Sequence, residues 1–253
     1  MKRIATLALI GADSPAARNE LASGNAVETA FGIVKPTAPE TIEGAIFDLD
    51  GTLLDSMPWW DDLGERYLRS RGKTPNPDIR YHFKRMTMEQ SAEYMKTTYG
   101  LEESLDEICA GVMGGIEDAY RQAIPCKPGV VDMLQALQTA GVRTCVATAS
   151  RRDVVLAAFQ RLDILRYFSA VFTCSEVGAS KTEPAIFDIS LKHLDTPRNA
   201  TMVFEDSLHA IETAHAAGFP VALVDEPANA SDAEQSARLA DVRVKAFTAF
   251  SRL

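Results

Sequence analysis

Two aspartates, Asp48 and Asp50, end the apolar run AIFDLD and stand directly before Gly51. In a strand, residues i and i+2 project to the same side, so we expect the two carboxylates to face one point while the glycine lets the chain turn away. The alternative is a plain turn, since Asp-Gly pairs are frequent in turns. Because like charges this close repel each other, a bound cation or a reaction explains the pair better.

Three further apolar runs end in residues that can take part in chemistry. Thr148 and Ser150 follow the run VRTCVA, Lys181 comes shortly after AVFTC, and Glu205 with Asp206 closes TMVFE. Ligands of open α/β sheets bind at the carboxyl ends of the strands, so we expect these side chains to converge on one crevice. Thr148 and Ser150 also precede a helix-like stretch, for which they would be suitable N-cap residues.

This set of side chains matches the needs of phosphoryl transfer, which are an in-line nucleophile, a cation, hydrogen-bond donors and an acid for the leaving oxygen. Asp48 and Asp206, with waters and the Asp50 carbonyl, provide the hard oxygen ligands that suit Mg²⁺. Asp48 can attack phosphorus and form an aspartyl phosphate. Asp50 can protonate the departing alcohol and then deprotonate the attacking water. Thr148 can donate to the phosphoryl oxygens, and Lys181 can offset their charge.

The elements that must position these groups follow a strand-then-helix alternation from residue 45 onward. Amphipathic stretches such as VVDMLQALQTAG and DVVLAAFQRL separate short β-rich apolar runs. This alternation predicts an α/β fold with a doubly wound parallel sheet covered on both faces. The expected strands are residues 45–49, 142–148, 170–174, 201–205 and 221–224.

The alternation is interrupted after the aspartate pair, where helix-like segments follow one another without a buried strand. We therefore expect an inserted α-helical subdomain. At the start of the chain, Ser14-Pro15 predicts a helix start, residues 16–34 a helix and residues 35–44 a linker. The predicted parts are an N-terminal extension of unknown role at 1–42, an α/β core at 43–56 and 128–253, and the helical subdomain at 57–127.

Composition excludes several classes of protein. The 253 residues are 46% hydrophobic and 24% charged, as in an ordinary globular protein, and the net charge of −9 without a Lys/Arg-rich run argues against a nucleic-acid or membrane-surface partner. The four cysteines show no C-x-x-C spacing, which disfavours zinc and disulfides and fits the cytoplasm. The start MKRIATLALIG is short for a secretory signal, and we expect an extra strand or helix start there.

Four motifs, in this order, resemble those of the haloacid dehalogenase (HAD) superfamily hydrolases: FDLDGT at 47–52, VATAS at 146–150, SKTEPAIF at 180–187 and VFEDS at 203–207. Within the superfamily, the chain is similar to the β-phosphoglucomutase-like phosphatases with a helical cap. The resemblance implies a HAD-like Rossmannoid core and a phosphoric monoester hydrolase. It also makes the helical subdomain a cap that gates access and selects the substrate.

The resemblance implies roles for individual residues and a kind of substrate. The implied catalytic residues are Asp48, Asp50, Thr148 and Lys181. The implied phosphate-binding residues are Thr148, Ala149, Ser150 and Lys181, and the implied Mg²⁺ ligands are Asp48, Asp50, Glu205 and Asp206. The implied substrate is a small phosphorylated metabolite, a sugar phosphate or a similar monoester.

Two alternatives are a phosphomutase of the β-phosphoglucomutase type and a catalytically inactive HAD-fold binding protein, and departures from the family pattern bear on the first. Mutases of that type carry a cap histidine twelve residues after the nucleophile, where this chain has Trp60. Met88 stands where such enzymes have the arginine that holds a second phosphate, although Lys84 and Arg85 lie nearby. Both departures favour a phosphatase.

Overall fold

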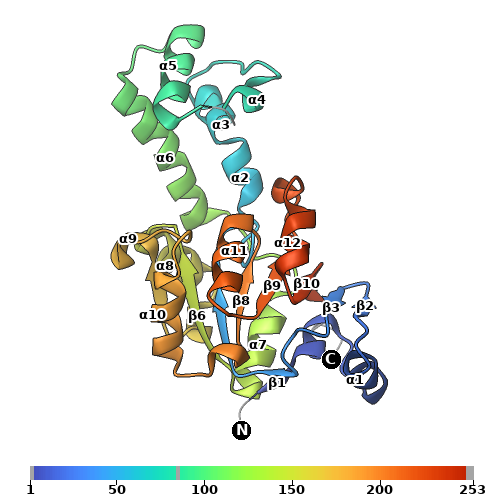
Figure 1. Ribbon diagram of the computed structural model, residues 1–253. Helices are drawn as coiled ribbons and strands as arrows, with labels where there is room; N and C mark the ends of the chain where they lie inside the picture. The colour runs from blue at the N-terminus through green and yellow to red at the C-terminus, as the bar shows by residue number, and fades with distance from the viewer. Residues whose placement is uncertain (1–2, 84–85, 249–253) are drawn as a thin grey trace. The chain divides into compact units, whose positions relative to one another are not determined.

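The computed structural model describes residues 3–83 and 86–248 (Figure 1). The chain forms two compact units, which are joined at Asp55–Ser56 and at Ile124–Pro125. The first, here called the core unit, contains the segments before and after these joints; the second, the helical unit, is Ser56–Ile124. None of the described helices is long and apolar enough to cross a membrane.

The core unit is built on an eight-stranded sheet in the order β2-β3-β10-β9-β8-β5-β6-β7. Its strands are β2 (Val27–Thr29), β3 (Gly32–Val34), β5 (Gly44–Phe47), β6 (Arg143–Thr148), β7 (Val171–Thr173), β8 (Thr201–Glu205), β9 (Val221–Val224) and β10 (Val242–Val244). Neighbours from β10 to β7 are parallel, whereas β3 is antiparallel to β2 and β10. The predicted α/β fold with a parallel sheet is confirmed, and each of the expected strands is present.

The strand order reverses beside β5, which lies between β6 and β8. From β5 the chain continues to β6 and β7 on one side, and it then crosses to β8, β9 and β10 on the other. In open α/β sheets, ligands bind beside such a reversal, at the carboxyl ends of the strands. Asp48 follows β5 directly and Glu205 ends β8, so both lie at this end of the sheet.

Helices cover both faces of the sheet (Figure 1). Those of the core unit are α7 (Val130–Ala140), α8 (Arg152–Arg161), α9 (Cys174–Val177), α10 (Ala185–Leu194), α11 (Leu208–Ala216) and α12 (Ala233–Leu239). Ile46 of β5 packs in a buried cluster with Ile186 of α10 and Ile211 of α11. Phe47, on the opposite face, stacks on Phe204 with 4.4 Å between ring centroids. The apolar run of β5 is therefore buried on both sides, as expected for a central parallel strand.

The N-terminal segment belongs to the core unit and differs in part from its predicted structure. Helix α1 (Pro15–Ala22) begins where expected, and the Ser14 hydroxyl caps it by accepting from the Ala17 amide at 3.2 Å. The predicted helix over 16–34 is wrong beyond Ala22, because Gly24 adopts φ +85° and the chain continues into the hairpin of β2 and β3. Local helix propensity there is overridden by pairing with β10.

The first described residues also form regular structure. Strand β1 (Ile4–Ala5) pairs antiparallel with β4 (Thr41–Ile42), and a buried 3₁₀ helix, η1 (Thr6–Ile10), follows β1. The expected strand or helix start at this position is present. The predicted linker over 35–44 is wrong at its end, where β4 and the start of β5 lie.

The helical unit contains α2 (Met57–Asp61), α3 (Leu63–Ser70), α4 (Ile79–Phe83), α5 (Met88–Tyr99) and α6 (Leu105–Gln122). Capping boxes at Thr87 and Gln90, and at Ser104 and Glu107, start the two longer helices, α5 and α6. The described part of this unit contains no strand. Lys84, one of the two cations noted beside the predicted second-phosphate position, lies with Arg85 outside the described residues.

Candidate active site

The turn after β5 sets the first side of the site. The Asp48 amide donates to the Phe204 carbonyl at 2.9 Å, which ties this turn to β8. Gly51 has φ +83°, and a Cβ at this position would lie 2.8 Å from the Asp206 Cγ and closer still to Oδ2. The turn therefore requires glycine for two reasons, its backbone conformation and the space that the Asp206 carboxylate fills.

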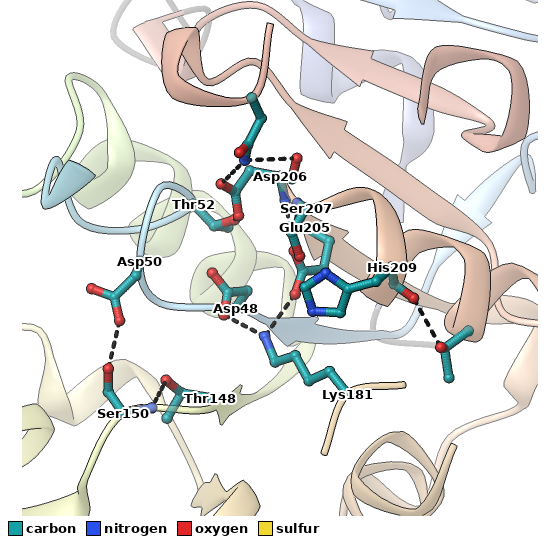
Figure 2. A network of polar contacts seen from close by, with 12 residues as sticks. Asp48, Asp50, Thr52, Thr148, Ser150, Lys181, Glu205, Asp206, Ser207 and His209 are labelled. Atoms are coloured by element: carbon teal, nitrogen blue, oxygen red, sulfur yellow. Dashed lines mark hydrogen bonds and ion pairs between the residues drawn. The ribbon is translucent and has the colours of Figure 1, made fainter. Parts of the chain in front are cut away.

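Lys181 lies buried between two carboxylates (Figure 2). Its ammonium group pairs with Asp48 Oδ1 and with Glu205 Oε1, the second at 2.6 Å. Burial alone would lower the pKa of Lys181, but the two negative charges together raise it above its ordinary value. The lysine is therefore a fixed positive charge at the carboxyl ends of β5 and β8.

Three acidic groups remain close together around this single cation. One carboxylate oxygen from each of Asp48, Glu205 and Asp206 lies within 4.8 Å of the others. Burial and the neighbouring negative charges raise the pKa of Asp48 to about 7 and that of Asp206 to about 9. Asp48 Oδ2 is buried and has no hydrogen-bond partner among the residues that the structure describes. An unpartnered oxygen within a crowded set of hard oxygen donors fits a small divalent cation.

Glu205 accepts more hydrogen bonds from protein groups than Asp48 or Asp206 does. Its Oε2 accepts from the amides of Asp206 and Ser207 at 2.8 and 2.9 Å and from the Ser207 hydroxyl at 3.0 Å. Burial would raise its pKa, but Lys181 and these hydrogen bonds keep the pKa below its ordinary value. Glu205 therefore stays ionised and fixes both Lys181 and the start of the loop that carries Asp206.

Asp50 and the serine and threonine after β6 form a second polar group. The Ser150 hydroxyl donates to Asp50 Oδ2 at 2.6 Å, and the Ser150 amide donates to Thr148 Oγ1 at 3.0 Å. Helix α8 begins at Arg152 with Arg151 as its N-cap, so the expected capping by Thr148 or Ser150 is wrong. The Ser150 side chain instead contacts the turn after β5, and the Thr148 hydroxyl accepts from the backbone of its own loop.

Comparisons with known proteins agree with this geometry. The sequence profile of the haloacid dehalogenase-like hydrolases matches residues 45–224. The chain belongs to this family. It is 25% identical, over 70% of its length, to a phosphorylated carbohydrates phosphatase of Thermotoga maritima, of which it covers 82%. It is 30% identical, over 81% of its length, to validoxylamine A 7'-phosphate phosphatase of Streptomyces hygroscopicus subsp. limoneus, of which it covers 93%.

The family also supplies solved structures with the same fold. A Thermotoga maritima protein assigned as a β-phosphoglucomutase superposes with a TM-score of 0.71 at 23% identity, over 83% of this chain and 98% of its own. The predicted HAD-like fold and superfamily are thus confirmed. The family match and the phosphatase relatives also confirm the expected class of enzyme, a HAD-like phosphoric monoester hydrolase.

The structure places the predicted site residues of this HAD-like enzyme in two neighbouring groups (Figure 2). Strand β5 ends at Phe47, so both aspartates lie in the turn, where strand alternation does not fix their direction. Asp48 points to Lys181, whereas Asp50 points to Ser150 (Figure 2). Ala149 lies between the two hydroxyl residues and is exposed.

Two residues that hold Asp206 were not among the predicted site residues. Thr52 is buried, and its hydroxyl donates to Asp206 Oδ1 at 3.3 Å. Asn229 donates through Nδ2 to Asp206 Oδ2 at 2.7 Å. Thr52 belongs to the motif FDLDGT and could have been found there. Asn229 stands in DEPANAS, a stretch without a motif.

Trp60, which stands where mutases have histidine, is half-buried and contacts other residues of the helical unit. The indole N–H donates to the Tyr120 hydroxyl at 3.2 Å. Trp60 also lines a cavity of about 210 Å³ within this unit, together with Met86 and Met88. An indole N–H that already donates to a tyrosine does not replace the proton chemistry of an imidazole.

Proposed function

We propose that this HAD-like enzyme is a Mg²⁺-dependent phosphatase that hydrolyses a small phosphorylated metabolite, such as a sugar phosphate, through an aspartyl phosphate on Asp48. The observation that carries the proposal is the arrangement around Asp48. One carboxylate oxygen pairs with Lys181, and the other is buried without a described partner beside Asp206. The relatives that act on phosphorylated carbohydrates and on validoxylamine A 7'-phosphate support the class of substrate.

Mg²⁺ would be held by Asp48 and Asp206, with the Asp50 main-chain carbonyl and with Glu205 nearby. The raised pKa values of Asp48 and Asp206 support this assignment, since a cation would relieve the repulsion that raises them. When bound, Mg²⁺ would neutralise part of the charge on the phosphoryl oxygens.

Side chains of the chain itself supply the remaining chemistry. Asp48 attacks phosphorus, so that a new P–O bond forms to its carboxylate while the bond to the departing alcohol breaks. Asp50 gives its proton to that alcohol oxygen and later takes one from the water that hydrolyses the aspartyl phosphate. Lys181 keeps the Asp48 carboxylate in place. Thr148 and Ser150 donate to the phosphoryl oxygens.

The helical unit is the proposed cap, which would exclude water until the alcohol has departed. The indole of Trp60, whose N–H donates to Tyr120, argues against the phosphomutase alternative, because it cannot take up and return a proton as the histidine of a mutase does. Intact Asp48, Asp50, Lys181 and Asp206 argue against an inactive binding protein.

The test is phosphate release from sugar phosphates, nucleotides, phosphoglycolate and phosphoserine, with and without Mg²⁺. We expect metal-dependent release that Asp48→Asn abolishes while the circular dichroism spectrum and the unfolding temperature stay near those of the parent. Asp195→Asn is the matched control, because this aspartate is highly exposed and asparagine accepts its φ of +50°. Near-normal release by Asp48→Asn would refute the assignment, and conversion of a hexose 1-phosphate to the 6-phosphate would show a mutase.

A further inference from the structure

The loop after β9 reaches the carboxylate that the proposed function assigns to the metal. This loop contains the short 3₁₀ helix η4 (Pro227–Asn229), which ends at Asn229. One amide nitrogen of Asn229 donates both to Asp206 Oδ2, at 2.7 Å, and to the Asp206 main-chain oxygen, at 3.2 Å. Thr52 holds the other carboxylate oxygen at 3.3 Å. The side chain and the backbone of Asp206 are therefore fixed together.

We propose that Asn229 is a positioning residue, which sets the direction of the Asp206 carboxylate so that it can bind a divalent cation. This inference rests on the proposed function and assigns a role that the family motifs do not contain. Each carboxylate oxygen offers about two lone pairs, so one hydrogen bond to each oxygen orients the group and still leaves electron density for a metal. Partners of metal ligands commonly act in this way.

A largely buried ion pair and local hydrogen bonds hold the loop of Asn229 in place. Glu226 accepts from the Ala228 amide at 3.0 Å and forms an ion pair with Lys127 at 2.8 Å. The side chains of Glu226 and Lys127 are only 5% and 12% exposed. Lys127 also donates to the Asp225 carbonyl at 2.9 Å, so its ammonium group contacts the loop twice.

Lys127 connects this loop to the turn that carries the aspartates. Its backbone amide donates to the Leu53 carbonyl at 2.9 Å, and Leu54 bridges to Cys126 next to it. Leu53 follows Thr52, the second donor to Asp206. The two residues that hold the Asp206 carboxylate are thus attached to one paired segment of backbone at residues 53–55 and 125–127, and we infer that this segment keeps them in register.

The test compares Mn²⁺ binding, measured by calorimetry on the full chain, in the parent and in two variants. Asn229→Ala removes the amide, and Asn229→Leu replaces it with a branched side chain of similar shape that cannot donate. We expect the dissociation constant for Mn²⁺ to rise about 10- to 100-fold in both. At saturating Mg²⁺ we expect the KM of both variants for the phosphoester to stay near that of the parent. General damage to the fold would change this KM as well as the metal affinity.

Asn199→Ala is the matched control, because this asparagine is exposed on η3 (Arg198–Ala200), away from the loop of Asn229. Its Mn²⁺ affinity should equal that of the parent. Unchanged affinity in Asn229→Ala, or parental affinity in Asn229→Leu, would overturn the positioning role while the phosphatase assignment stands. A parent that binds no Mn²⁺ and releases no phosphate would overturn both.

Discussion

Replacement of Gly51 by alanine tests whether the turn after Asp48 and the Asp206 carboxylate must fit each other. The added Cβ would lie 2.8 Å from Asp206 Cγ, a separation that Cβ atoms in proteins do not show. Asp206 is buried and is held on both carboxylate oxygens, so it cannot yield without losing contacts to Thr52 or Asn229. Gly51→Ala should therefore displace a proposed metal ligand.

The magnitude follows from two separate terms. An alanine at φ +83° costs roughly 1–2 kcal/mol of folding free energy, because its Cβ approaches the backbone in the left-handed region. Gly24 has φ +85° and nothing within 4 Å of a built Cβ, so Gly24→Ala carries the first term alone. The displacement of Asp206 adds the loss of a hydrogen bond, about 0.5–1.5 kcal/mol.

Urea unfolding, Mn²⁺ calorimetry and phosphate release together separate the two terms. We expect both variants to be less stable than the parent, and Gly51→Ala to be the less stable of the two. Only Gly51→Ala should lose metal affinity and phosphatase activity, each by roughly a factor of 10 or more. If Gly51→Ala kept parental metal affinity and turnover, the argument that Asp206 fills the space beside Gly51 would be wrong.

Two further predictions concern the charges of the site. Lys181→Met should lower the free energy of unfolding by about 3–5 kcal/mol in urea titrations, because it leaves Asp48 and Glu205 buried without their cation. It should also abolish phosphate release. A loss of stability below about 1 kcal/mol would contradict this prediction. The pKa of Asp48 rises from 3.8 to about 7 and that of Asp206 from 3.8 to about 9, so in this pH range the metal-free folded protein binds more protons than the unfolded chain. The stability that these two groups give to the metal-free protein should therefore fall as pH rises to about 9. Mg²⁺ should raise the unfolding temperature more at pH 9 than at pH 5, because fewer protons then compete with it. An equal rise at both pH values would refute this.

Much of the core could be predicted from sequence because its strands are buried on both faces. Such strands read as short continuous apolar runs, and AIFDL and TMVFE leave no amphipathic helix as an alternative. The motif residues at their ends could be predicted for the same reason, since the carboxyl ends of neighbouring parallel strands meet. The short hairpin of β2 and β3 could not be predicted from the sequence. Its strands have only three residues each, and the hairpin is stabilised by the pairing of β3 with β10.

The aspartate pair shows where strand alternation stops being a guide. Asp48 and Asp50 share a direction only if β5 continues through them, and it ends at Phe47. Beyond that point the direction of each side chain is decided by tertiary partners, Lys181 for Asp48 and Ser150 for Asp50. The sequence indicated that both residues lie at the end of this strand, but their separate surroundings could be seen only in the fold.

Asn229 marks a more general limit. Family motifs contain the groups that touch the substrate or the metal, because the chemistry restricts their type and spacing. A residue that only orients such a group can come from any loop that passes nearby, and Asn229 reaches Asp206 from a loop 23 residues further along the chain. Its effect nevertheless acts on the same carboxylate as Thr52 and Gly51. If all three act through the position of Asp206, then combining Asn229→Ala with Gly51→Ala should weaken metal binding by less than the product of the two separate effects.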